Sequence, residues 1–479
     1  MRAFTGNRSG LAVALVCVAQ FVIVLDVTVV TSALPALGRE LGFTADDLQW
    51  VITAYVLAFG GFLVAGGRAA DLVGARRAFT IGLAGFAAAS LGCGLASTGW
   101  VLIAFRVLQG LAAALLTPAA LALLNAVTEP GAARRRAVGI WTAAAAGGGA
   151  SGWVLGGLLA EYAGWRWVFL INVPVGVAGL SVVALVLPRL AAATTQRLDL
   201  LGAVGLTAGL SLVAYGLSEA AAESPNLWLV AVPLIAGAVI LAGTLAYERR
   251  VTAPLLPPGL LRPPAVRGAN LLAAALTAST SPAMFLAVLY VQEVLALSPG
   301  RAAWLFPALN VTVIGGSLAG PALIGRLGPR RAAVGGLVLI GAGSLLLTAV
   351  PPTGLPVLRL LSSFALMGLG LGVASVASTA VGTAAVEPAD RGVSAGVLNS
   401  AAQLGTALGL AVLTPLATRA GSGPDGVYDG LWLGWVGAAT IAALGIAAAL
   451  RLPGRESPAQ PEPAAEPSMS SPAAPGHRT

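Results

Sequence analysis

Two ionisable residues lie well inside long apolar segments of the chain. Asp26 stands in the run VIVLDVTVVTSALPAL, and Arg106 opens the motif RVLQG. A charged side chain at the centre of a membrane helix costs about 2.5–3.5 kcal/mol on insertion scales, and such residues face a cavity or a partner. Each of these two residues therefore needs a partner or a function.

The carboxyl group of Asp26 has two interpretations. Burial disfavours the charged form of a carboxyl group, so a buried carboxylate can bind and release a proton near physiological pH. Asp26 is then a candidate for proton coupling. The alternative is a structural role, in which Asp26 holds a neighbouring helix by a hydrogen bond.

Arg106 cannot lose its proton, so its guanidinium group must meet water, a carbonyl or a carboxylate. Asp26 is one conceivable partner, and Gln109 follows one turn later on the same helix face. If Asp26 and Arg106 meet, protonation of the carboxylate weakens their attraction. Such a pair offers a route from a proton to helix movement.

An internal repeat indicates that the scaffold itself does not need this charge. The run LQGLAAALLTPAALALLNAVTEP matches LMGLGLGVASVASTAVGTAAVEP, which lies 258 positions further along the chain. In the second copy, Phe364 and Met367 stand where the first has Arg106 and Gln109. Only one copy keeps the charged group, which favours a function for it.

The elements that carry these residues are membrane spans. Of the 479 residues, 57% are hydrophobic and 10% are charged, against about 25% charged in a soluble domain. This composition excludes a soluble globular protein. Cys17 and Cys93 lie in apolar runs and the single histidine, His477, lies in the tail, so no metal site or disulfide framework is expected.

Fourteen segments are long enough to cross about 30 Å of hydrocarbon, which takes about 20 apolar residues. They are 10–37, 46–67, 78–97, 100–127, 137–160, 166–187, 199–218, 226–247, 268–292, 301–325, 332–350, 356–385, 392–418 and 429–450. With both termini in the cytoplasm, 21 of the 27 arginines fall on cytoplasmic segments and 5 on external ones. Because cytoplasmic loops carry the positive excess, we predict this orientation.

The repeat divides the spans into two six-helix units with a helix pair inserted between them. This is the organisation of a secondary transporter, whose substrate site lies near the midplane between repeats. The predicted parts are an N-terminal bundle (1–190), the inserted helices 7 and 8 with their linker (191–265), a C-terminal bundle (266–451) and a cytoplasmic tail (452–479). The tail is rich in Pro, Ala and Ser and is predicted to be disordered.

The fifth segment contains GGGASGWVLGG, which suits close helix packing. Gly148, Gly152 and Gly156 recur every four residues on one face, followed by Gly157, and such small residues let helix backbones approach closely. We expect this segment to pack along the seam between the halves, although ordinary helix packing explains the same glycines. Trp153 lies on a neighbouring face, which points to lipid or to the cavity.

The turn after the second segment has the sequence GRAADLVGARRA. It holds Gly67, Asp71, Gly74, Arg76 and Arg77. A positive turn at the cytoplasmic surface needs no further function, but Asp71 could also clamp a neighbouring helix end through its charge.

Polar side chains inside spans are candidate linings of a substrate cavity. Each of them could equally hold two helices together. They are Gln20, Asn125, Asn172, Asn270, Asn310, Asn399 and Gln403.

Several motifs resemble those of the major facilitator superfamily, in particular its 14-helix drug:proton antiporter branch, over residues 10–450. The motifs are LDVTVVTSALP (25–35) in the first helix, GRAADLVGARR (67–77) in the loop between helices 2 and 3, RVLQG (106–110) in the fourth helix and WRWVFLINVPVG (165–176) at the entry into the sixth. The resemblance implies proton coupling at Asp26 and proton transfer or its control at Arg106, with Gln109 beside them. It also implies a cytoplasmic gate at Asp71 and the arginines that follow it.

The chain departs from the antiporter pattern at four places. Trp153 replaces a Pro in the fifth-span motif, Thr31 replaces an Asn in the first helix, Gly325 stands in the second copy where Asp71 stands in the first, and Ala402 replaces the Arg of the NxxRQ pattern. These departures concern the standard proton route and the rocking geometry, and they do not affect the fold.

The leading expectation is a secondary transporter that exports a small hydrophobic drug, antibiotic or secondary metabolite by proton antiport and alternating access. An enzyme is not expected, and the absence of GxxxxGK[ST] excludes ATP hydrolysis by this chain. Asp26 is the only acid at depth, so either it serves both the proton and a cationic substrate, or the substrate is neutral or weakly charged, which we favour. A facilitator or importer of a small metabolite and a transport-inactive sensor remain alternatives.

The expected partners are the small-molecule substrate and the lipid bilayer, without nucleic acid. We expect a monomer in the cytoplasmic membrane of a bacterium, with no cofactor besides the proton gradient.

Overall fold

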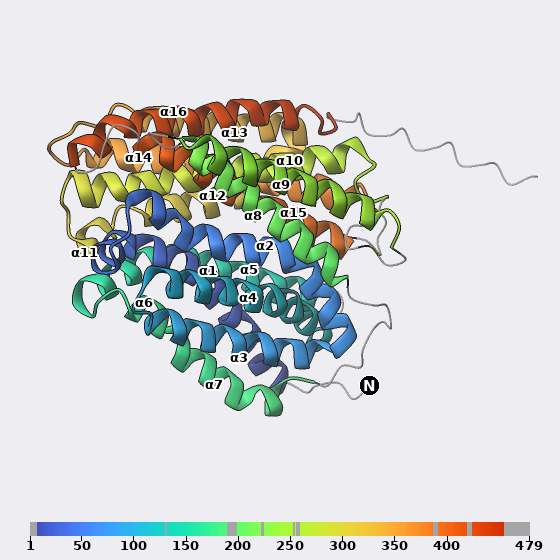
Figure 1. The fold of residues 1–479 in the computed structure, drawn as a ribbon. Coiled ribbons are helices and arrows are strands. Elements are labelled where there is room, and N and C mark those ends of the chain that lie inside the picture. The colour runs from blue at the N-terminus through green and yellow to red at the C-terminus, as the bar shows by residue number, and fades with distance from the viewer. Residues whose placement is uncertain are drawn as a thin grey trace, which may run out of the picture.

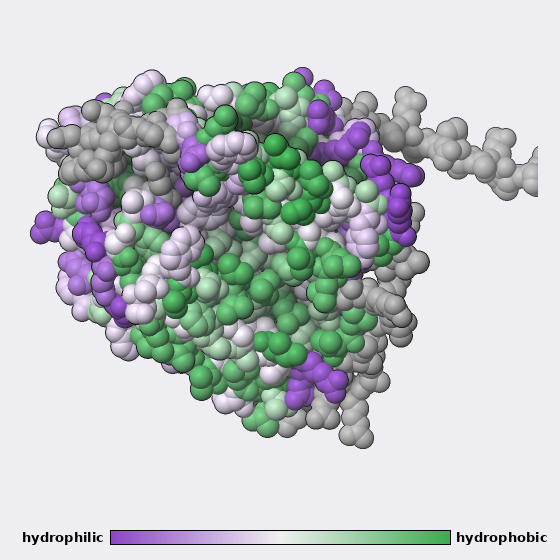
Figure 2. All heavy atoms as spheres, in the orientation of Figure 1, coloured by the Kyte–Doolittle hydropathy of each residue, from purple (hydrophilic) through white to green (hydrophobic). Residues whose placement is uncertain are grey.

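The computed structural model describes residues 7–129, 132–188, 199–221, 225–251, 254, 259–386, 391–418 and 424–454. Within these ranges every regular element is a helix, and 14 helical segments are long and apolar enough to cross a membrane. The predicted all-α membrane fold and its number of spans are confirmed. Hydrophobic residues cover the middle of the face shown in Figure 2, and hydrophilic residues gather toward its two ends.

The helices fall into three groups along the chain (Figure 1). The first group is α1 (Asn7–Leu41), α2 (Ala45–Val73), α3 (Ala75–Gly94), α4 (Gly99–Val127), α5 (Ala132–Tyr162), α6 (Trp167–Leu170) and α7 (Asn172–Val186). The inserted pair is α8 (Leu200–Ala221) and α9 (Leu227–Glu248). The last group is α10 (Pro264–Leu289), the π-helical turn η1 (Tyr290–Val294), α11 (Pro299–Ala302), α12 (Pro307–Leu327), α13 (Pro329–Leu347), α14 (Val357–Ala384), α15 (Arg391–Thr418) and α16 (Pro424–Ala449).

The same helix pairs pack together in the first and last groups. In the first group α1 packs on α5, and α4 packs on both α2 and α3. In the last group α10 packs on α15, and α14 packs on both α12 and α13. The internal repeat of the sequence is therefore also a repeat of structure.

Two glycines at matched places in the repeat make the sharp turns between neighbouring helices. Gly74 joins α2 to α3 with φ 87°, and Gly328 joins α12 to α13 with φ 83°. Side chains with a Cβ rarely adopt this backbone conformation, whereas glycine adopts it freely. The turn therefore depends on glycine in both copies.

The inserted pair lies where the two halves meet. Helix α8 contacts α2, α15 and its own partner α9, and Figure 1 shows α8 in green beside α2 and α15. The Gln49 amide on α2 donates to Ser218 Oγ on α8 at 3.0 Å. The insertion thus covers one side of the seam between α2 and α15.

Helix α1 continues past its predicted segment, 10–37, to Leu41. The charges of Arg39 and Glu40 ended the segment in the sequence, but both side chains have partners in the fold. Arg39 pairs with Glu293, and Glu40 pairs with Arg166.

The end of the described chain overlaps the predicted tail, 452–479. Leu452 is buried, and its carbonyl accepts a hydrogen bond from Arg330 Nε at 2.9 Å. The predicted disorder of the tail from residue 455 onward lies outside the described residues.

Candidate functional site

Asp26 and Arg106 form an ion pair in the interior of the first group of helices. Arg106 Nη1 donates to Asp26 Oδ2 at 2.5 Å, and both side chains are 0% exposed. Asp26 Oδ1 accepts two more hydrogen bonds at 2.8 Å, from Gln109 Nε2 and from Asn172 Nδ2. The carboxylate therefore connects α1 to α4 and α7.

The guanidinium group of Arg106 has further partners on α2 and α4. Its Nε donates to the Val51 carbonyl at 2.9 Å, and its Nη1 also donates to Gln109 Oε1 at 2.7 Å. The centre of the guanidinium group lies 4.2 Å from the centroid of the Tyr55 ring. A cation over an aromatic face is stabilised electrostatically, so the Tyr55 ring helps to hold the Arg106 guanidinium group in place.

Ser90 on α3 completes the network. Its hydroxyl oxygen accepts from Gln109 Nε2 at 2.9 Å and from Asn172 Nδ2 at 3.4 Å. All of these side chains are buried. Four spans, together with the backbone of α2, thus meet at one buried charged site.

Close helix contacts bring Arg106 to its partners. A Cβ at Gly110 would lie 2.5 Å from the Tyr55 carbonyl oxygen, and a Cβ at Gly82 would lie 2.9 Å from Leu116 N. Glycine at these positions lets α4 approach both α2 and α3. The RVLQG motif therefore combines a charge, an amide and a close-approach glycine on one stretch of helix.

The hydrogen-bond partners of Asp26 are all donors. The charges of Asp26 and Arg106 cancel, and all three groups hydrogen-bonded to Asp26 are N–H donors. A protonated carboxyl group would itself be a donor and would face donors at both oxygens. A proton can therefore bind Asp26 only if part of this network rearranges.

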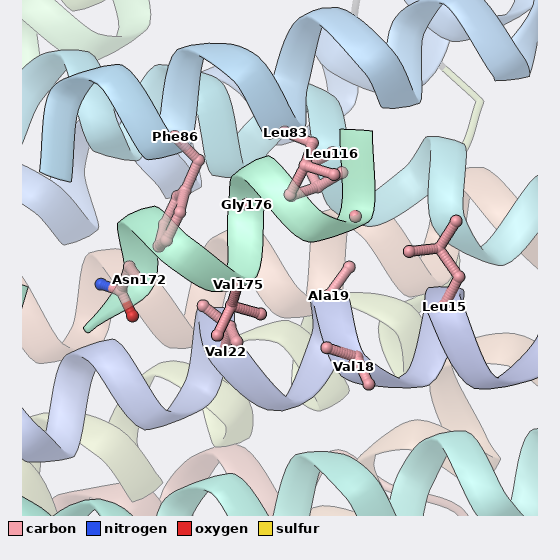
Figure 3. Close-up of a pocket in the computed structure, with 11 residues that line it drawn as sticks. Leu15, Val18, Ala19, Val22, Leu83, Phe86, Leu116, Asn172, Val175 and Gly176 are labelled. Atoms are coloured by element: carbon pink, nitrogen blue, oxygen red, sulfur yellow. The ribbon is translucent and has the colours of Figure 1, made fainter. Parts of the chain in front are cut away.

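A small cavity of about 10 Å³ lies beside this network, between α1, α3, α4 and α7. Figure 3 shows that Asn172 reaches its edge while apolar side chains such as Val22 and Phe86 line the rest. Asn172 Oδ1 is buried and makes no hydrogen bond within the described part of the chain. The amide of Asn172 thus separates the ion pair from an apolar space.

The first and last groups of helices are joined at the end that we predict to be external. Arg39 pairs with Glu293 at 3.2 Å, and Gln292 Nε2 donates to the Ser32 carbonyl at 2.9 Å. Glu161 Oε2 accepts from the backbone N–H of Gly300 at 2.6 Å. These contacts involve α1 and α5 on one side and η1 and α11 on the other.

Aromatic stacking continues the seam toward the middle of the molecule. The rings of Trp153 and Phe306 stack with centroids 4.7 Å apart, and Phe306 stacks on Phe364 at 5.5 Å. Trp153 is buried, so it faces the other half and not lipid. Asn310 lies nearby, because a Cβ at Gly149 would be 2.9 Å from its Oδ1.

A model of the Major Facilitator Superfamily matches residues 16–410 and 268–477 of the chain. The chain belongs to this superfamily. It is a multi-pass membrane transporter and not an enzyme.

Relatives in the superfamily cover most of the chain. The puromycin resistance protein of Streptomyces alboniger is 40% identical over 437 residues, which are 88% of this chain and 86% of that protein. The cephamycin export protein of Amycolatopsis lactamdurans is 39% identical over 419 residues, which are 87% of this chain and 86% of that protein. A peptide transporter crystallised with sulfate shares the fold with a TM-score of 0.68 at 18% identity, over 94% of this chain and 96% of that one.

The glycine stripe of this superfamily member divides between two contacts. Cβ atoms at Gly148, Gly152 and Gly156 would lie 2.3–2.9 Å from carbonyl oxygens of α1, so this face packs within its own half. Gly157 is the member that faces the other half, where a Cβ would lie 2.4 Å from the Pro299 carbonyl oxygen. Only part of the stripe lies on the predicted seam.

The predicted gate residues lie along the end that we predict to be cytoplasmic. Asp71 is exposed, and among the described residues no hydrogen bond or ion pair joins it to a neighbouring helix. Arg76 Nη2 donates to the Ala184 carbonyl of α7 at 3.3 Å, and Arg77 is exposed. Besides these residues the predicted gate contains Gly74 at the turn and Gly67, which faces Pro118 of α4.

The remaining polar residues predicted to line a cavity are scattered. Gln20 is buried, Asn125 is half-buried and Asn399 is exposed. Gln403 on α15 packs against a glycine of α2, and Asn270 donates to a carbonyl of its own helix. These residues do not form one cluster with Asn310 and Trp153.

Two members of the buried network carried no distinguishing signal in the sequence. Ser90 and Tyr55 are neutral, so neither is out of place inside a membrane helix. Asn172 was one of several polar candidates. Only the fold shows that Ser90 binds Gln109 and that Asn172 binds Asp26.

Proposed function

We propose that this transporter exports a small, largely apolar antibiotic or secondary metabolite from a bacterial cell in exchange for protons. The relatives named for resistance to puromycin and for export of cephamycin support this class of substrate. The chain would act as a monomer in the cytoplasmic membrane, with the proton gradient as its source of energy.

The observation that carries the proposal is the set of three donors around Asp26. Proton uptake by this carboxylate leaves Arg106 without its counter-ion and turns one acceptor oxygen into a donor. The link from α1 to α4 and α7 then weakens. Binding of a proton and movement of α1 are therefore coupled through the same atoms.

Movement of α1 would reach the seam between the halves. The same helix carries Ser32 and Arg39, which bind Gln292 and Glu293 on η1. With the predicted orientation, these contacts close the external end. We infer that the proton state of Asp26 is linked to the state of this end. Exchange of an exported substrate for incoming protons requires the protonated carrier to return with this end closed, and the substrate-loaded, deprotonated carrier to open it.

The surroundings of Asp26 support a neutral or weakly charged substrate. The carboxylate is 0% exposed and already accepts three hydrogen bonds within its own group of helices. It has no free face for a positively charged substrate. The seam near Trp153 and Phe306 is aromatic and apolar, which suits an apolar compound.

The test is efflux from bacterial cells that lack their own drug exporters and express this chain. Puromycin, a cephamycin and a panel of neutral and cationic dyes are loaded, and their loss is followed with and without a protonophore. We expect export of at least one compound, and we expect the protonophore or Asp26→Asn to reduce its rate by tenfold or more. Glu40→Gln, an exposed carboxylate on the same helix, should leave the rate within about twofold.

Two outcomes would contradict the proposal. Accumulation of a compound above the level in control cells would indicate an importer. Export that continues unchanged in the Asp26→Asn variant would show that this carboxylate does not couple protons.

A further inference from the structure

A pocket of about 780 Å³ opens at the predicted external end, away from the buried ion pair. The inserted helix α8 forms one wall with Leu212, Tyr215 and Glu219. The turns before α2 and α4 form the opposite wall, and Pro415 of α15 closes one side. The pocket thus lies between the inserted helix α8, the first group of helices and α15.

Four aromatic side chains are among its lining. Phe43, Trp50, Trp100 and Tyr215 all contribute, and the ring centroids of Trp50 and Tyr215 are 6.1 Å apart. Trp100 is 81% exposed, which leaves its ring free to meet a ligand. Several aromatic faces around one space suit an organic cation.

The charge of the pocket has one sign. Asp47 and Glu219 line it, and no basic residue is among the described residues that do. An aromatic belt at the membrane surface accounts for the rings, and the capping box of α2 accounts for Asp47, but neither accounts for the carboxylate of Glu219 in the same hollow. The combination is complementary to a ligand with a positive charge and an apolar body.

The two carboxylates are held in place by local contacts. Asp47 accepts from the hydroxyl and the backbone N–H of Thr44, at 2.7 and 3.2 Å, in the capping box of α2. Glu219 Oε1 accepts from the backbone N–H of Asn226 at 3.4 Å, and the neighbouring Ser218 accepts the hydrogen bond from Gln49 that fastens α8 to α2. The walls of the pocket therefore have a fixed spacing.

We propose that this pocket binds a lipophilic organic ammonium or phosphonium cation at the external surface, separately from the export path. The rings of Trp50, Trp100 and Tyr215 contact its apolar groups and its charge, while Glu219 and Asp47 neutralise it. The ammonium headgroup of a phospholipid has the same chemistry as a free cation. Both sources are therefore tested.

The probe is tetraphenylphosphonium, titrated into the full-length protein in detergent while binding is measured by calorimetry. We expect Glu219→Gln and Trp50→Leu each to weaken binding by tenfold or more, and Ser211→Phe, which fills the pocket without changing its charge, to abolish it. The matched control Trp304→Leu lies at the same end outside the pocket and should change affinity less than twofold. Size-exclusion profiles identify any variant that fails to fold.

The uncharged analogue triphenylphosphine oxide should bind at least tenfold more weakly than the cation. Competition with the probe by phosphatidylethanolamine but not by phosphatidylglycerol in nanodiscs would identify a lipid amine as the resident ligand. Absence of such competition would leave the free cation as the ligand. Equal affinity of the pocket variants and the parent protein for the probe would overturn the proposal.

This result is independent of the export proposal. Binding is measured without transport, and Asp26→Asn should bind the probe as the parent does. Failure of proton-coupled export and failure of cation binding can therefore be told apart.

Discussion

At the scale of single residues, Asp26 and Arg106 each make the burial of the other tolerable. Removing one member of a buried ion pair leaves an uncompensated charge and costs about 3–5 kcal/mol, whereas replacing both is often nearly neutral. The pair is therefore poor evidence for stability. Its retention in one copy of the repeat, where the other has Phe364, indicates a use in function.

A double-mutant cycle tests this view. Asp26→Asn leaves the Arg106 cation buried without its partner, so we expect a destabilisation of about 3–5 kcal/mol. The double variant Asp26→Asn/Arg106→Leu should recover most of that loss while remaining inactive in export. Thermal unfolding in detergent measures stability, and additive effects of the two changes would contradict a direct coupling.

The charged members of this network could be predicted from the sequence, and the neutral ones could not. Asp26 and Arg106 are conspicuous because a charge is rare inside a membrane span. Gln109 followed from helical spacing alone. Ser90 and Tyr55 carry no such penalty, so only the packing of α2 and α3 against α4 reveals their role.

At the scale of helices, the glycines of α5 set its distance from α1. Their spacing predicted that one face would pack closely, but the pattern does not name the partner helix. The structure places α1 there, and it leaves Gly157 for the other half. Sequence periodicity defines a face, whereas the partner depends on how all the helices assemble.

Matched alanine substitutions on α5 test this contact. A Cβ at Gly148 would lie 2.3 Å from the Phe21 carbonyl oxygen, whereas a Cβ at Gly139 meets nothing within 4 Å. We expect Gly148→Ala to destabilise the protein by about 1–3 kcal/mol, since backbones must separate. Gly139→Ala should be neutral or stabilising by up to about 1 kcal/mol, because alanine favours helix.

Thermal unfolding in one detergent compares the two variants directly. Equal midpoints would show that α1 and α5 have room for a methyl group, against the close approach described above.

At the scale of the whole molecule, the contacts at the predicted external end hold the two halves in the arrangement of this structure, in which that end is closed. The number of spans and the repeat could be predicted from hydropathy and from self-comparison. The closed end could not, because a transporter sequence must be compatible with more than one arrangement of its halves. The small energies that separate such arrangements come from contacts such as Arg39–Glu293, which the sequence places 254 positions apart.

A reversible cross-link tests whether this end must open. In the double variant Arg39→Cys/Glu293→Cys, oxidation should join α1 to η1 and reduce export by tenfold or more. Reduction should restore it, because the paired residues are exposed at the rim, with side chains 61% and 34% exposed. Oxidised single-cysteine variants serve as controls, and undiminished export by the cross-linked protein would show that these contacts need not break.

Two of the contacts that close this end come from the π-helical turn η1. A π turn contains one residue more than the corresponding stretch of α-helix, and η1 spans Tyr290–Val294. The backbone N–H of Leu295 bonds to the carbonyl of Tyr290 across this wide turn at 2.9 Å, and Gln292 and Glu293 lie inside it. The side chains of η1 that bond to α1, an amide and a carboxylate, thus both come from one widened helical turn, so the closure between the halves depends on the local register of that turn.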